Sequence, residues 1–89
     1  MINLTKASLY EDYKVKLYFS DNSFGILDFS YLLKANTVLT KPLEDSTYFK
    51  KFFIDFGALC WKNGLELSAE SLYLKLKNQG NLHFAKDVA

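Results

Sequence analysis

Hydrophobic and polar positions alternate most regularly over residues 14–19, which predicts a strand with one buried face. The face expected to be buried carries Val15, Leu17 and Phe19. The opposite, exposed face carries Lys14, Lys16 and Tyr18. A polar turn over residues 20–23 leads into a returning strand over residues 24–29. A weaker pattern over residues 2–9 predicts a further strand beside this hairpin.

Two short helices are expected after the hairpin. Ser30 is predicted to cap a helix over residues 31–35, and Asp45 a helix over residues 46–52. Both have a side-chain oxygen that can accept a hydrogen bond from a free backbone N–H at a helix start. Residues 36–42 between them are predicted to be a connector, since their proline resists a helix.

Turn and cap signals are dense in the segment that follows. Residues 53–56 and 58–61 predict two short strands around Gly57. Asn63 and Gly64 form the strongest short turn signal in the chain, because a type I′ hairpin turn needs positive φ at both central positions. Next, Ser68 is expected to cap the last helix.

The pattern over residues 72–78 fits two structures. Leu72, Tyr73 and Leu76 match one face of a helix, whereas strict alternation of leucine with tyrosine or lysine matches a strand. A helix to about Asn78, ended by Gly80, is favoured, and the strand alternative stays open. Residues 79–89 are predicted to be a flexible C-terminal tail.

These elements predict a single α+β domain over residues 1–78. Its expected order is β-β-β-α-α-β-β-α, with a small antiparallel sheet of about four to five strands and two or three short helices. The composition supports a folded protein, because 49% of the residues are hydrophobic and 17% are aromatic. Buried rings of that number can build a compact core in a chain of 89 residues.

Charge and cysteine content narrow the function classes. The net charge is +1 and the chain contains lysine but no arginine, so direct nucleic-acid binding is not expected. The single cysteine, Cys60, has no internal partner for a disulfide. Neither a signal-peptide pattern nor a long apolar run is present, so a cytoplasmic protein without membrane association is expected.

The side chains that usually carry catalysis are sparse. His83 is the only histidine, the acids are scattered and the four glycines are isolated, so no catalytic, cofactor-binding or metal site is predicted. A protein that is not an enzyme is therefore expected. The alternative is an enzyme or small-ligand protein with a pocket lined by tyrosine and aspartate side chains. A deep pocket that holds Asp28, Asp45 or Asp55 would favour that alternative.

Several short motifs occur in a distinctive order. They are a phenylalanine before an aspartate turn, a strand ending in aspartate, a leucine-rich helix, a leucine–acid–aspartate step before an aromatic pair, a tryptophan–x–asparagine–glycine segment and a leucine–tyrosine. They occupy residues 17–21, 26–28, 31–33, 43–45 with 48–49, 61–64 and 71–73. In this order the chain resembles the small bacterial family known as domain of unknown function 2442, also described as similar to the N-terminal domain of a Nitrosomonas two-domain protein.

The resemblance implies an α+β domain without a known catalytic residue. Some members of the family are fused to helix-turn-helix domains, and others are encoded beside a second small protein in an arrangement similar to a toxin–antitoxin pair. This sequence differs from the pattern at Asn22, where glycine is usual, and it continues beyond the leucine–tyrosine.

Together these features lead us to expect a protein–protein binding module, antitoxin-like or regulatory, with a small, toxin-like protein partner. A surplus of tyrosines supports this expectation, because exposed tyrosines give large, stiff contact areas. The residues expected to bind the partner are Lys14, Lys16, Tyr18, Tyr73 and Leu74. Uncovered sheet edges would also permit a homo-oligomer. A third reading is weak nucleic-acid binding within a complex.

Overall fold

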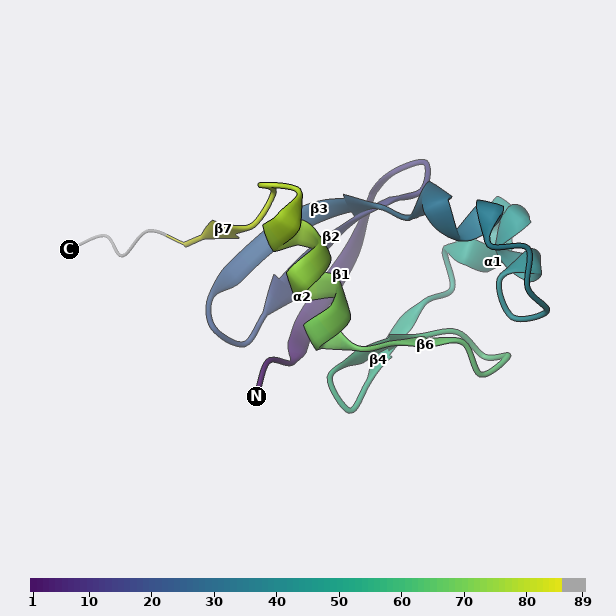
Figure 1. The fold of residues 1–89 in the computed structure, drawn as a ribbon. Coiled ribbons are helices and arrows are strands. Elements are labelled where there is room, and N and C mark those ends of the chain that lie inside the picture. The colour runs from purple at the N-terminus through teal and green to yellow at the C-terminus, as the bar shows by residue number, and fades with distance from the viewer. Residues whose placement is uncertain (86–89) are drawn as a thin grey trace.

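Two antiparallel sheets and a few short helices make up the computed structural model, which describes residues 1–85 (Figure 1). The α+β fold class is thereby confirmed. One sheet has four strands in the order β1-β2-β3-β7, and the other has three in the order β4-β5-β6. The strands expected in a single sheet therefore divide between two.

The larger sheet consists of β1 (Leu4–Glu11), β2 (Lys14–Phe19), β3 (Ser23–Asp28) and β7 (His83–Phe84). The smaller sheet consists of β4 (Phe53–Asp55), β5 (Ala58–Cys60) and β6 (Glu66–Leu67). The helical segments are the 3-10 helices η1 (Phe29–Lys34) and η2 (Lys41–Glu44) and the α-helices α1 (Ser46–Phe49) and α2 (Ala69–Asn78).

The alternation in β2 sorts its side chains as predicted, with Val15, Leu17 and Phe19 buried. Helix α2 lies across this inner face of the larger sheet (Figure 1) and buries Leu72 and Leu76 there. The opposite face, which carries the polar positions of β2, has no helix over it in the described chain.

An aromatic cluster joins the two sheets and the short helices. Trp61 is 1% exposed, and its ring lies 5.8 Å from that of Phe49 and 6.5 Å from that of Phe29. Its indole Nε1–H donates a hydrogen bond to the Phe49 carbonyl oxygen at 2.9 Å. Trp61 is therefore a core residue and not a surface residue.

The cap of the first helix lies two residues earlier than expected. Asp28, not Ser30, occupies the N-cap position of η1, which starts at Phe29. The Asp28 carboxylate accepts hydrogen bonds from the Ser30 N–H at 2.9 Å and from the Ser30 hydroxyl at 2.7 Å. The prediction that Ser30 is the cap was wrong. The Asp28 carboxylate, two residues upstream, already accepts the free backbone N–H, and the Ser30 hydroxyl donates to the same carboxylate.

Helix α1 begins at its cap Asp45, whose side chain accepts a hydrogen bond from the Thr47 N–H at 2.9 Å. It ends at Phe49, three residues before the predicted end. The predicted connector before it contains η2, with Pro42 in the first turn, where a missing N–H removes no helical bond.

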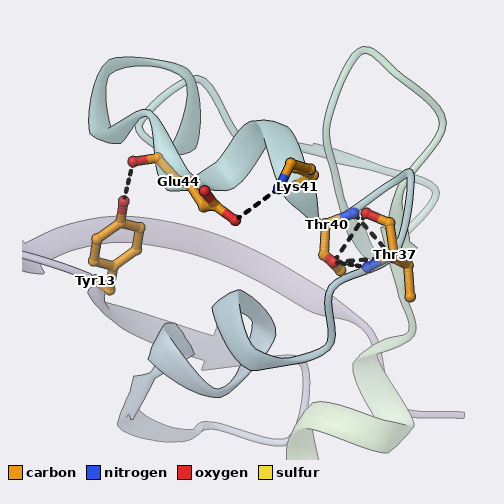
Figure 2. Close-up of polar contacts among 5 residues, drawn as sticks. All are labelled: Tyr13, Thr37, Thr40, Lys41 and Glu44. Carbon is orange, nitrogen blue, oxygen red and sulfur yellow. Dashed lines mark hydrogen bonds and ion pairs between the residues drawn. The ribbon is translucent and has the colours of Figure 1, made fainter.

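Polar contacts fix η2 to the β1–β2 turn (Figure 2). The Tyr13 hydroxyl donates to the Leu43 carbonyl oxygen at 2.7 Å and approaches that of Glu44 at 3.2 Å. Before η2, the Thr37 and Thr40 side chains bond to each other at 2.9 Å and to each other's backbone. The Lys41–Glu44 ion pair at 3.8 Å is exposed and contributes little.

The pair of consecutive positive φ values predicted at Asn63 and Gly64 occurs elsewhere. Gly64 has φ of 96°, but Asn63 is not among the positive-φ residues of the described chain. The Asn63 side chain accepts from the Leu65 N–H and donates to the Leu39 carbonyl oxygen, so it holds the turn from a different conformation. Two consecutive positive φ values occur instead at Phe56 (49°) and Gly57 (75°), between β4 and β5.

Residues 69–78 form a helix, which excludes the strand alternative over 72–78. Ser68 caps its start by accepting from the Ser71 N–H at 3.1 Å. At its end, Gly80 has φ of 72°, and the N–H groups of Gly80 and Asn81 bond to the carbonyl oxygens of Lys77 and Leu76. This pattern is a Schellman motif.

The Schellman motif turns the chain back along the edge of β3, where β7 pairs with it. The predicted flexible tail therefore starts too early, because residues 79–84 include a strand that covers a free sheet edge. The remainder of that prediction, for residues 86–89, lies outside the described chain.

Candidate functional site

The five residues expected to bind a partner lie on opposite sides of the larger sheet. Lys14, Lys16 and Tyr18 project from β2 on the uncovered face. Tyr73 and Leu74 belong to α2, which covers the other face (Figure 1). The structure therefore divides the predicted site into two surfaces.

We call the uncovered face the outer sheet face. Strand register places on it Lys6 of β1, Lys14, Lys16 and Tyr18 of β2, Phe24 and Ile26 of β3, and His83 of β7. Lys16 Nζ lies 5.2 Å from the centre of the Tyr18 ring and 5.1 Å from that of Phe24. Lys6 Nζ lies 5.4 Å from the Tyr18 ring. The side chains thus form an interleaved row of lysines and aromatic rings.

Two hollows adjoin on this face. The larger, of about 590 Å³, is lined by Tyr10, Lys14, Asp28 and His83 among others, and the smaller is about 280 Å³. Both are lined by Lys16 and Phe24. The volume of the larger hollow is within the range of small-ligand sites.

Asp28 is the carboxylate in the larger hollow, and it is already engaged. Hydrogen bonds from the Ser30 N–H and hydroxyl lower the pKa of Asp28, with a smaller contribution from the charge of Lys14. The carboxylate is therefore held ionised as a helix cap. Asp45 also caps a helix, and Asp55 lies in β4 of the other sheet, so of the three acids named for a pocket only Asp28 lines this hollow.

Tyr73 is tied into the fold. Its hydroxyl donates to Asp21 Oδ2 at 2.8 Å, and its ring meets that of Phe19 edge-on at 5.3 Å. The hydrogen bond to Asp21 raises the pKa of Tyr73. In contrast, the neighbouring Leu74 keeps 47% of its surface exposed.

Leu74 belongs to a second surface, which we call the apolar patch and which consists of Met1, Ile2, Phe56 and Leu74. These four residues line one hollow of about 500 Å³, together with the carboxylates Glu66 and Glu70. A neighbouring hollow of about 610 Å³ shares Met1, Ile2, Glu70 and Leu74. Apolar and acidic side chains thus line the same hollow.

Phe56 is the feature that the sequence analysis missed. Its side chain is 98% exposed, and its backbone is left-handed with φ of 49°. A bulky residue in that region is strained, and glycine or asparagine is favoured there. The available signal was a two-residue loop ending in Gly57, in which the first position also requires positive φ.

The two other reactive side chains, Cys60 and His83, belong to different sheets. Cys60 is buried in β5, and burial raises the pKa of its thiol. His83 lies beside the Phe24 ring at 5.7 Å. Over the described chain, no group of three or more histidine, cysteine, aspartate or glutamate side chains could hold a metal ion. None of its helices has the length and apolarity to cross a bilayer.

The family model described as protein of unknown function, DUF2442, matches residues 4–78, which include every helix and strand except β7. Searches of curated proteins and of solved structures found no match.

Proposed function

The chain belongs to the DUF2442 family of proteins of unknown function, and on this premise we propose that it is a protein-binding module, antitoxin-like or regulatory, that uses the apolar patch. Its partner is a small, toxin-like protein. The patch places Met1, Phe56 and Leu74 around one hollow without covering them.

The exposed, left-handed Phe56 carries this proposal. Folding gives no reason for a phenylalanine here, because the ring buries almost nothing and the backbone favours glycine or asparagine. Aromatic residues are enriched among the few side chains that dominate protein–protein binding energy. An anchor that inserts into a partner's pocket explains both the residue type and its exposure.

The acidic residues beside the patch indicate the chemistry of the partner. Glu66 and Glu70 line the same hollow as Phe56, and no lysine is among its lining residues. A partner surface with an apolar pocket and lysine or arginine side chains around it would complement this arrangement. Such surrounding charges mainly affect the association rate, whereas the buried anchor determines the dissociation rate.

Where a small protein is encoded beside the gene, as for some members of the family, the test measures its binding to this protein by calorimetry, with both proteins purified. Phe56→Asn is expected to weaken binding about 30-fold or more while the fold is retained, since loss of a hot-spot side chain has effects of this size. Val38→Asn is the matched control, because Val38 is an exposed apolar residue, 88% accessible, outside the patch.

Equal binding by the Phe56→Asn and wild-type proteins would refute the patch as the contact surface. An absence of binding by the wild-type protein would count against the neighbour-encoded partner. In the antitoxin-like case, co-expression of wild-type protein, but not of Phe56→Asn, relieves growth arrest caused by the partner.

A further inference from the structure

We propose that the outer sheet face binds a short segment of single-stranded nucleic acid. This function is separate from that of the apolar patch and uses the opposite side of the larger sheet. Bases would stack on the aromatic row of Tyr18, Phe24 and His83, and phosphates would lie near Lys6 and Lys16.

The aromatic row crosses three neighbouring strands. The ring centres of Tyr18 in β2 and Phe24 in β3 are 6.2 Å apart, and those of Phe24 and His83 in β7 are 5.7 Å apart. Proteins that bind single strands without sequence preference combine such stacking platforms with basic grooves. The row therefore provides adjacent stacking positions on an open antiparallel sheet.

The charge on this face is more positive at one end. Lys14 pairs in register with Glu11 on one side and Asp28 on the other, so its charge is locally balanced. Lys16 pairs with Ser8 and Ile26, and Lys6 with Tyr18, so neither faces a carboxylate. Lys6 and Lys16 are therefore the side chains available to phosphate, although the whole chain has a net charge of only +1.

In the free protein, Lys6 and Lys16 lie over the aromatic rings on which the bases would stack. At a surface, a cation–π contact is weak, and base stacking on an aromatic side chain is the stronger interaction. A lysine side chain is long and flexible, so its ammonium group can leave the ring and reach a phosphate at the edge of the face. Lys6 and Lys16 can thus contact the rings in the free protein and the phosphates in the complex.

The shape of the face favours an extended ligand. The two hollows, of about 590 and 280 Å³, meet at Lys16 and Phe24 rather than forming one enclosed cavity. Gln79 and Asn81 line the larger hollow and offer amide groups to base edges. A single nucleic-acid strand that lies across both hollows would contact β2, β3 and the segment after α2.

The test uses fluorescence anisotropy with a labelled twelve-nucleotide oligouridylate and the full chain, over a series of salt concentrations. Two phosphate contacts predict a slope of log affinity against log salt of about −1.4, because each contact to a single strand contributes about −0.7. Such a shallow slope would distinguish this face from a strongly basic one.

Two variants separate charge from stacking. Lys16→Gln is expected to weaken binding about 5-fold and reduce the slope by about 0.7. Phe24→Leu is expected to weaken binding about 10-fold with the slope unchanged, since stacking is not a counterion effect. Lys62→Gln and Phe56→Asn, both off this face, should bind as the wild type does, and thermal melts establish that each variant is folded.

Three results would overturn the proposal. The first is no binding by the folded wild-type protein at millimolar concentration and low salt. The second is an equal loss for Lys16→Gln and Lys62→Gln. The third is equal or tighter binding of a labelled oligoglutamate peptide with the same dependence on Phe24, which would assign the face to acidic protein segments. None of these results depends on whether the apolar patch binds a protein.

Discussion

Tyr73 and Asp21 are joined across 52 residues of sequence by a hydrogen bond of 2.8 Å from the phenolic hydroxyl to Oδ2. The contact fixes helix α2 to the turn between β2 and β3. Asp21 also accepts hydrogen bonds from the Ser23 N–H at 3.0 Å and from the Ser23 hydroxyl. Burial opposes ionisation of Asp21, but the hydrogen bonds from Ser23 and Tyr73 outweigh it and lower its pKa.

This relationship predicts a specific dependence of stability on pH. Because the folded-state pKa of Asp21 is lowered, its contribution is present above the unfolded-state value of about 3.9 and is lost as pH falls through the folded-state pKa. Tyr73→Phe removes one of the bonds, so this variant should be less stable at pH 7 and lose less stability between pH 5 and 2.

Urea unfolding across this pH range measures the effect. Tyr10→Phe is the control, because Tyr10 is 57% exposed and makes no side-chain hydrogen bond in the described structure. Parallel pH profiles for wild type and Tyr73→Phe would show that the Tyr73 hydroxyl does not help to lower the Asp21 pKa.

Replacement of the core tryptophan should be strongly destabilising. Trp61→Phe leaves the buried Phe49 carbonyl oxygen without its donor at 2.9 Å and removes volume from the aromatic cluster. We expect a loss of about 2–4 kcal/mol in the free energy of unfolding, from the unpaired carbonyl and the cavity together. Phe53→Leu, at a ring 43% exposed, should cost below about 1 kcal/mol in the same denaturant titration.

A methyl group at Gly25 should displace the segment after α2. The added Cβ would lie 2.4 Å from the backbone oxygen of Asn81 and 3.1 Å from the Leu76 methyl groups. We expect Gly25→Ala to destabilise the fold by about 1–3 kcal/mol and to speed amide exchange at Ala85, whose N–H donates to the Asn22 carbonyl oxygen.

Gly64→Ala is the comparison for that variant, since no atom lies within 4 Å of its added Cβ and only the φ of 96° is unfavourable. It should cost about 1 kcal/mol and leave amide exchange at Ala85 unchanged. Wild-type exchange in Gly25→Ala would mean that the backbone at Asn81 shifts without releasing β7.

Relief of strain at Phe56 should stabilise the protein. Phe56→Asn is expected to raise the free energy of unfolding by about 0.5–1 kcal/mol, because asparagine accepts the left-handed conformation more readily. For a chain of 89 residues this corresponds to an increase in Tm of a few degrees. A decrease in Tm would show that the ring makes stabilising contacts in the free protein.

The sequence predicted those elements that depend on residues close together in the chain. The alternation in β2 depends on one buried face, and the Ser68 cap and Gly80 stop determine the limits of α2 within a few residues. Capping signals that compete within two residues were harder to rank. Ser30 and Asp28 both suit a cap, and the carboxylate takes that position because it accepts two bonds.

Features that depend on distant contacts were not predicted. The two-residue strands β6 and β7 exist only because β5 and β3 offer edges to them. Asn63 adopts its conformation with its amide bonded to Leu39, 24 residues away, so the dipeptide alone did not determine the turn type. The binding residues chosen by residue type were likewise spread over two surfaces that only the tertiary fold defines.

Strand β7 has a consequence for the behaviour of the protein at high concentration. Without it, the β3 edge at Ser23 and Phe24 would present free backbone N–H and C=O groups between apolar side chains, a template on which other chains can add. A chain ending at residue 80 should therefore aggregate more readily in light scattering even where its monomer is folded. We therefore expect these two paired residues of β7 to slow fibril-like growth from this edge.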